Sequence, residues 1–193
     1  MRATQLIAPV VRREPVPWPF VVLFDDVLDA AECRALVALV DELGPEIAPI
    51  TTPRGFEMRP DIRNNERVMF DNAPLAAELF GRMRPELPPV MEDGTLVGLN
   101  ERFRGYRYQP GHRFAPHYDG SFVRDESERS HLTVLFYLNG DFTGGQTTFE
   151  DLSVTVTPRP GQALVFEHPL LHEGCPVLAG RKYVLRSDVM YRR

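Results

Sequence analysis

Two histidines and one aspartate have the types and spacing of a metal site. His117 and Asp119 stand two residues apart in the run Pro-His-Tyr-Asp-Gly, and His172 follows much later in the chain. Side chains two apart on a strand point to the same face, so His117 and Asp119 can bind one ion together. Two imidazoles and one carboxylate make a facial triad for iron(II), whose open positions suit a bidentate 2-oxo acid and dioxygen. These three residues are the predicted metal ligands.

Lys182 is the predicted partner of a second carboxylate on such an acid. The chain has 22 lysine and arginine residues, and Lys182 is the single lysine among them. A buried carboxylate is costly unless it is paired, so a pocket for a dicarboxylate needs a cation at its closed end. Strand alternation puts Lys182 and Arg186 on one face and Arg181 on the other, although one β-bulge after His172 would reverse this. The spacing favours Lys182, with Arg181 and Arg186 as the alternatives.

The elements that must position these residues are short. Asp29, Glu32 and Gly44 delimit a helix from about Ala30 to Leu43. A second amphipathic helix is expected over 72–87, and the polar stretch 51–67 suggests a loop with some helix. Strands are expected over 20–24, 96–108, 114–118, 131–139, 154–157, 162–167 and 182–191.

This order of elements predicts a mainly β protein with flanking helices. Two helices that lead into about eight short strands suggest an antiparallel, cupin-like jelly roll. The 18 prolines and 14 glycines fit the many turns of such a fold. We expect one domain over residues 1–193, with a strand and bracing helices in 1–94 and the catalytic jelly-roll core in 95–193.

Charge and composition argue against several classes of partner. The net charge is −5 and the arginines are dispersed, which disfavours a nucleic-acid partner. The short apolar stretch near the start is interrupted by Pro9 and followed by Arg12 and Arg13, unlike a signal peptide, and no stretch has the ~20 apolar residues of a membrane span. Cys33 and Cys175 form no metal-type cluster. A cytoplasmic protein without a membrane partner is expected, and its oligomeric state is left open.

Further motifs accompany the triad in a set order. Tyr108 and Pro110-Gly111 precede it, and the order resembles that of the prolyl-4-hydroxylase-like branch of the iron(II)- and 2-oxoglutarate-dependent dioxygenases. The resemblance runs from about Leu96 to Tyr191. Its motifs are His117-x-Asp119, Tyr137-Leu138-Asn139, Gly144-Gly145-Gln146-Thr147, the Pro160-Gly161 turn, and His172-Glu-Gly-Cys-Pro-Val with Lys182 ten residues on.

The resemblance implies a double-stranded β-helix with the triad as iron ligands and catalytic centre. It implies that Lys182 pairs with the distal carboxylate of 2-oxoglutarate, that Tyr137 donates a hydroxyl to that carboxylate, and that Tyr108 lies near the chelating end. The implied reaction is hydroxylation of an unactivated C–H bond, in a prolyl or other peptide or amino-acid substrate, with release of succinate and CO2. Iron(II), 2-oxoglutarate and dioxygen would be required, and ascorbate would be an optional supporting reductant.

Substrate contacts are less defined by the sequence. Arg67, Arg102, Arg104 and Arg186 are expected near the mouth of the site, which suggests an anionic small molecule or peptide. Arg186 would meet the substrate or the other cosubstrate carboxylate, or it would serve as a structural arginine. The polar segments 51–67 and 120–129 are candidate lids. Two other readings stay open, namely a metal-dependent cupin-type hydrolase or isomerase and a non-catalytic jelly-roll binding module.

Overall fold

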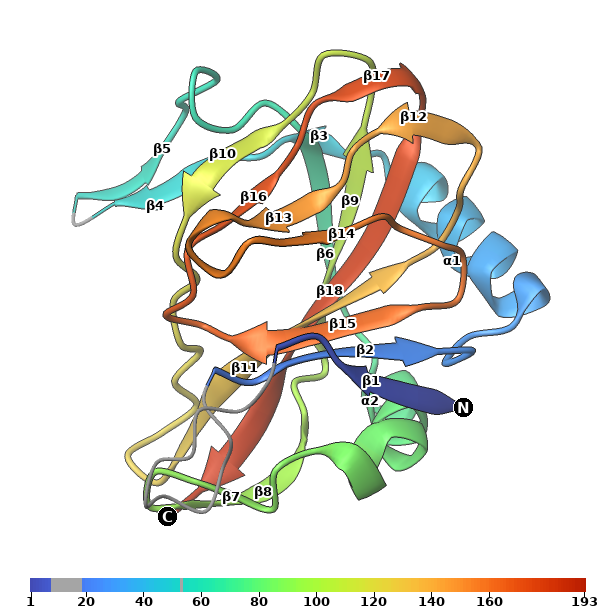
Figure 1. Cartoon of the computed structure of the whole chain (residues 1–193). Coiled ribbons are helices and arrows are strands. Elements are labelled where there is room, and N and C mark those ends of the chain that lie inside the picture. The colour runs from blue at the N-terminus through green and yellow to red at the C-terminus, as the bar shows by residue number, and fades with distance from the viewer. Residues whose placement is uncertain (8–18, 53) are drawn as a thin grey trace.

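Two β-sheets face each other, and two helices pack outside the larger one (Figure 1). The structure is a computed structural model that describes residues 1–7, 19–52 and 54–193. Pro9, Arg12 and Arg13 lie outside the described residues. None of the helices in the described part of the chain is long and apolar enough to cross a membrane.

The larger sheet contains ten strands among the described residues. Its central order is β2-β15-β11-β18-β9-β6, with β1 and β3 at the edges, and β8 pairs with the far end of β18 and with β7. The strands are β1 (Arg2–Gln5), β2 (Val21–Asp25), β3 (Glu46–Ile47), β6 (Glu66–Asp71), β7 (Val90–Met91), β8 (Gly94–Leu99), β9 (Arg102–Tyr108), β11 (Glu128–Tyr137), β15 (Ala163–Glu167) and β18 (Lys182–Arg192).

The smaller sheet lies over one face of the larger sheet and has the order β10-β16-β13-β14 (Figure 1). Two further sheets have two strands each, β12 paired with β17 and β4 paired with β5. The strands are β4 (Ile50–Thr52), β5 (Gly55–Glu57), β10 (Phe114–His117), β12 (Phe142–Gly144), β13 (Thr147–Phe149), β14 (Val154–Val156), β16 (His172–Gly174) and β17 (Val177–Gly180).

Capping residues mark the start of both helices. Helix α1 (Ala30–Glu42) begins after Asp29, which forms a reciprocal capping box with Glu32. Helix α2 (Ala73–Met83) begins after Asn72 and is followed by the 3-10 turn η1 (Arg84–Glu86). A second 3-10 turn, η2 (Glu150–Leu152), precedes β14. Both predicted helices are confirmed, and the second one ends a turn earlier than expected.

Strand alternation separates the core into two clusters. The outer face of the larger sheet packs against the helices, with Val40 of α1 lying over Gly105 of β9. A Cβ at Gly105 would come within 2.5 Å of Val40, so only glycine allows this approach. The inner face packs against the smaller sheet through residues such as Phe166 and Val184. The inner face therefore carries every second residue of β9, β11, β15 and β18.

Two sequence predictions need correction. The expected strand 96–108 is broken at Asn100, whose side chain accepts a hydrogen bond from the Arg102 N–H in an Asx-type turn. Strands β8 and β9 therefore pair with successive parts of β18. The described part of 51–67 contains no helix, because the chain forms the β4–β5 pair and then returns into β6.

Candidate metal and cosubstrate site

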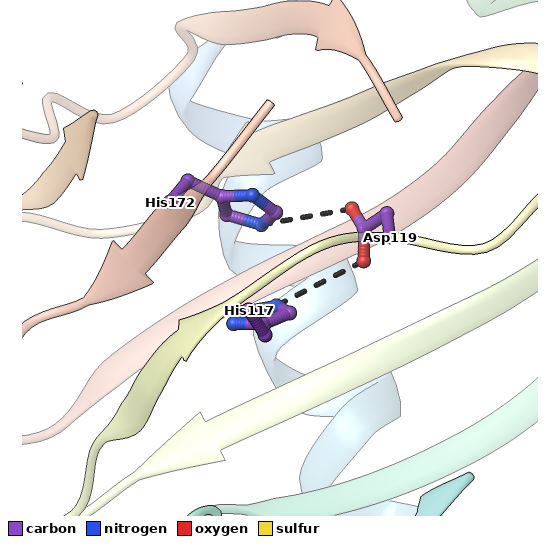
Figure 2. A group of neighbouring side chains, drawn as sticks. All are labelled: His117, Asp119 and His172. Carbon is purple, nitrogen blue, oxygen red and sulfur yellow. Dashed lines mark ion pairs between the residues drawn. The ribbon is translucent and has the colours of Figure 1, made fainter. Parts of the chain in front are cut away.

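His117 and His172 face each other across two neighbouring strands. His117 ends β10, His172 begins β16, and the two are direct partners in the antiparallel register. Their ring centroids lie 4.2 Å apart. Asp119 lies two residues beyond the end of β10, where its N–H donates to the carbonyl of His168. The predicted shared strand therefore ends before Asp119, but its side chain still turns toward both imidazoles (Figure 2).

The three predicted ligands are close enough to bind one ion. His117 Nε2 lies 3.8 Å from Asp119 Oδ1, and His172 Nε2 lies 3.6 Å from Asp119 Oδ2, as the dashed lines in Figure 2 mark. One donor atom from each residue lies within 4.8 Å of the other two. The structure thus brings together three side chains that the sequence spreads over 56 positions, from 117 to 172 counted inclusively.

Backbone carbonyls orient both imidazoles. His117 Nδ1 lies 2.8 Å from the carbonyl oxygen of Ala115, and His172 Nδ1 lies 2.9 Å from that of Leu170. An N–H at each Nδ1 donates to its carbonyl, which leaves the lone pair of Nε2 directed at Asp119. Burial, and then the neighbouring imidazole, lowers the pKa of His117 to about 3, and burial lowers the pKa of His172. Both rings are therefore neutral near pH 7 and able to bind a metal.

Both oxygens of Asp119 have fixed partners. Arg186 Nη1 lies 2.7 Å from Oδ1, and the Thr133 hydroxyl donates to Oδ2 at 2.6 Å. Burial would raise the pKa of Asp119, but the positive charge of Arg186 and the nearby imidazoles outweigh it, so the pKa lies below its usual value. Asp119 is therefore ionised and held in one orientation. Alternation had put Arg186 on the inner face, but the contacts of Arg186 and Thr133 with Asp119 were not predicted.

Lys182 is buried at the other end of the same cavity. Its side chain is on the inner face of β18, whereas Arg181 is exposed, so the predicted alternation is confirmed. Lys182 Nζ donates to the carbonyl of Gly145 at 2.6 Å and lies over the ring of Tyr108 at 5.1 Å. It has no carboxylate partner among the described residues. Burial lowers its pKa to about 8, as expected for a buried ammonium without a counter-ion.

The cavity joins the triad to Lys182. Tyr108 lines it, as expected, and Arg186 lines it near Asp119 rather than beside Lys182. Its walls are formed by Tyr106, Tyr108, Phe114, His117, Asp119, Leu135, Thr147, His172, Gly174, Lys182, Val184 and Arg186.

Tyr137 lies behind this wall, and its hydroxyl contacts the wall residue Thr147. Its hydroxyl is 2.8 Å from the Thr147 hydroxyl, and its ring is fully buried. Thr147 lines the cavity and Tyr137 does not. The hydroxyl that faces the cavity on this side therefore belongs to Thr147, at the end of the Gly-Gly-Gln-Thr motif.

A wider cleft of about 570 Å³ opens beside the triad. Arg67, Arg104 and Arg186 line it, as predicted, and the candidate lid 120–129 contributes Gly120, Ser121 and Phe122. Arg102 does not line it, because its guanidinium is paired with Asp71 near the surface. The other lining residues are Pro49, Ile50, Ile62, Arg63, Tyr106, Phe114, His117, Tyr118 and Asp119.

Comparisons with known proteins agree on the family. The sequence model of the 2OG-Fe(II) oxygenase superfamily matches residues 103–187, which contain the triad and Lys182. A protein of Acanthamoeba polyphaga mimivirus, assigned as a prolyl 4-hydroxylase, is 28% identical over 144 residues. That alignment covers 64% of this chain, and this chain spans 57% of the length of the viral protein.

Solved structures support the fold. A Pseudomonas putida prolyl-4-hydroxylase superimposes with a TM-score of 0.63 at 22% identity, covering 91% of this chain and 94% of that one. A Trichoplax adhaerens prolyl hydroxylase, solved in complex with a hypoxia inducible factor peptide, gives a TM-score of 0.64 at 18% identity, covering 88% and 82%. The predicted double-stranded β-helix is confirmed. Residues 103–187 thus match the 2OG-Fe(II) oxygenase superfamily, and the chain is similar to prolyl 4-hydroxylases in sequence and in fold.

Proposed function

We propose that this chain is an iron(II)- and 2-oxoglutarate-dependent dioxygenase that hydroxylates an unactivated C–H bond of a small-molecule or peptide substrate. The observation that carries the proposal is one cavity that is lined both by two neutral imidazoles with an ionised carboxylate and by a buried ammonium that lacks a carboxylate partner among the described residues. A metal-binding hydrolase would need the first feature but has no use for the second.

The donor set fits iron(II). Two neutral imidazoles and one ionised carboxylate match the facial triad of non-haem iron oxygenases, and the outer hydrogen bonds to the histidine Nδ1 atoms are those expected of metal ligands. His117, Asp119 and His172 would hold the ion. Lys182 fits the distal carboxylate of 2-oxoglutarate, because its charge lacks a carboxylate partner within the described part of the chain.

Iron(II) and 2-oxoglutarate would together supply the oxidising chemistry, in which dioxygen is reduced, the 2-oxo acid is decarboxylated to succinate and CO2, and one oxygen atom enters the substrate. The protein positions these groups. Lys182 and Thr147 bind the distal carboxylate, and Tyr108 forms the wall between that end and the triad. Arg186 and Thr133 keep Asp119 ionised and oriented. Phe114 stacks on His117 and Phe166 packs edge-on against His172, and these contacts hold the two imidazole rings in place.

A peptide or amino-acid substrate fits the open side of the site. The cleft beside the triad has a volume of about 570 Å³, which is within the ~300–1,000 Å³ range of small-molecule sites. The peptide complex of the Trichoplax adhaerens enzyme supports a peptide substrate by analogy of fold. Proline is one candidate residue for oxidation, on the strength of the names of the relatives alone.

The test is anaerobic addition of iron(II) and then 2-oxoglutarate. We expect the weak visible charge-transfer band of the metal–2-oxo acid chelate and, after air and ascorbate are admitted, iron-dependent succinate. His117→Ala, His172→Ala and Asp119→Asn should each abolish both signals, because a three-ligand site without one donor binds the ion poorly. His131→Gln is the matched control, since His131 lies against Tyr191 outside both cavities.

Folding is checked on the metal-free variants by circular dichroism. Near-normal succinate formation in any triad variant would remove that residue from the ligand set. Metal binding without the chelate band would favour the hydrolase or isomerase reading, and binding of neither metal nor 2-oxoglutarate would favour the non-catalytic module.

A further inference from the structure

The cleft beside the triad is strongly basic. Four arginines line it, namely Arg63, Arg67, Arg104 and Arg186, and Asp119 is the one carboxylate among its lining residues. The cleft adjoins the cavity that contains Lys182, and Arg63, Arg67 and Arg104 line the cleft but not that cavity. These charges therefore cannot be explained by the distal carboxylate of the cosubstrate.

Two of the four arginines are already neutralised. Arg104 Nη1 lies 2.9 Å from Asp188 Oδ2, and Arg186 Nη1 lies 2.7 Å from Asp119 Oδ1. Asp188 also lies 3.3 Å from Arg186. Two carboxylates thus balance these two guanidinium groups, and the excess positive charge of the cleft comes from the other two.

Arg63 is a buried cation without a carboxylate partner among the described residues. It is 5% exposed, its Nε donates to Asn65 Oδ1 at 2.8 Å, and its Nη2 has no hydrogen-bond partner. Its guanidinium lies over the rings of Tyr106 and Phe114, at 4.8 and 4.5 Å from their centroids. Stacking fixes the plane of the guanidinium, and the buried Nη2 is left without a partner in a side chain that lines the cleft.

Arg67 supplies the second unpaired charge. It is partly buried on β6 and makes no ion pair within the part of the chain that the structure describes. Desolvation lowers its pKa, and the positive charges of Arg63, Arg104 and Arg186 lower it further. Holding these like charges together is unfavourable unless an anion joins them.

We propose that Arg63 and Arg67 bind a carboxylate of the substrate, and so fix the carbon to be oxidised beside the triad. The inference rests on the proposed function. Arginine binds a carboxylate through two parallel N–H···O bonds, which sets orientation as well as affinity. The carboxylate belongs either to a free acid or to an acidic side chain of a peptide, since the cleft is open at its outer side.

The test is equilibrium dialysis of the anaerobic iron(II) protein, with one equivalent of 2-oxoglutarate, against two equimolar probe pools. The first pairs N-acetyl amino acids with their amides. The second pairs short N-acetyl peptide amides that contain Glu with the same peptides containing Gln. Mass spectrometry measures the retained fraction of each. We expect a preference of about tenfold or more for the acid member in one pool, from loss of a charge-assisted bond in its partner.

Matched variants assign the preference to the cleft. Arg67→Gln and Arg63→Gln should bring it close to unity, and Arg67→Lys should recover part of it. Arg34→Gln should leave it unchanged, because Arg34 is exposed on α1 and lines neither cavity. Preference in the first pool identifies a free acid, and preference in the second identifies an acidic peptide.

Equal retention of acids and neutral partners, or retention of neither, would overturn the inference. So would an acid preference that survives Arg67→Gln in a variant with unchanged thermal stability. The chelate band, recorded on the same samples, separates the two proposals. A normal band without acid preference refutes only the carboxylate site, whereas acid preference without the band supports that site and refutes the dioxygenase.

Discussion

Replacement of Lys182 by alanine tests the cosubstrate site apart from the unknown substrate. Lys182 is 3% exposed, and its ammonium group donates to the Gly145 carbonyl at 2.6 Å. No carboxylate among the described residues balances its charge. The distal carboxylate of 2-oxoglutarate would provide that balance, so Lys182→Ala should leave a desolvated anion without its cation.

The expected loss follows from the energy of one charge-assisted hydrogen bond. Such a bond contributes about 1.5–3 kcal/mol, which corresponds to about 10- to 150-fold weaker binding. Lys182→Arg should recover only part of this loss. The side chain passes Gly145 so closely that a Cβ there would lie 3.1 Å from Lys182 Cδ, which leaves little room for a planar guanidinium.

The assay is anaerobic titration of the iron(II) protein with 2-oxoglutarate, and the absorbance of the chelate band measures binding. Iron affinity without 2-oxoglutarate should not change in Lys182→Ala, because Lys182 is not in the ligand set. Arg181→Ala is the control, since Arg181 is the exposed neighbour on the other strand face. Unchanged 2-oxoglutarate affinity in Lys182→Ala, with a large loss in Arg181→Ala or Arg186→Ala, would refute the assignment.

Three more predictions concern the same cavity. Because burial lowers the pKa of Lys182 to about 8, 2-oxoglutarate affinity should be steady below pH 8 and fall above it, and a pH-independent affinity up to pH 10 would contradict this. The unfolded chain binds more protons than the folded chain between about pH 8 and pH 10.5, so the buried ammonium costs about 3 kcal/mol of stability at pH 7. Lys182→Met removes this cost but leaves the Gly145 carbonyl without its donor, which costs about 1–3 kcal/mol. The stability of the metal-free variant relative to the parent protein should therefore fall as pH rises through this range; urea unfolding measures the difference, and a difference that does not change with pH would contradict a lowered pKa of Lys182. Thr147→Val should weaken 2-oxoglutarate binding by about 2- to 13-fold and Tyr137→Phe by less, because Thr147 lines the cavity whereas the Tyr137 hydroxyl is hydrogen-bonded to Thr147 behind it. The opposite order in the titration would restore Tyr137 as the direct donor.

The sequence could predict which face of a strand each site residue occupies. A period of two depends only on local backbone geometry, so Lys182 and Arg186 could be assigned to the inner face of β18 and Arg181 to the outer face before any tertiary contact was known. The same rule assigns Thr133 and Tyr137 to one face of β11. The structure confirms each of these orientations.

The pairing of strands that are distant in the sequence could not be predicted from local sequence patterns. The direct register of His117 with His172 depends on the arrangement of β10 and β16, which have four and three residues. Strands this short contain too few residues for an alternation of apolar and polar side chains to be recognised. The strands β12, β13 and β17 were not predicted, for the same reason. The prediction that His172 joins the pair depended on its position after the strand that ends at Glu167 and on the order of the motifs.

The partners of the inner-face charges were also unpredictable, because long side chains reach across several positions. A network of alternating charges runs from Asp119 through Arg186 and Asp188 to Arg104, with successive N···O distances of 2.7, 3.3 and 2.9 Å. A buried charge is stable only when it is paired, and in this network each charged group contacts a group of opposite charge. This network keeps Asp119 ionised beside two imidazoles, and it also neutralises Arg104 and Arg186, two of the arginines that were predicted to contact the substrate. The charge left for a substrate therefore lies on Arg67, which was predicted, and on Arg63, whose burial against Tyr106 and Phe114 only the fold reveals.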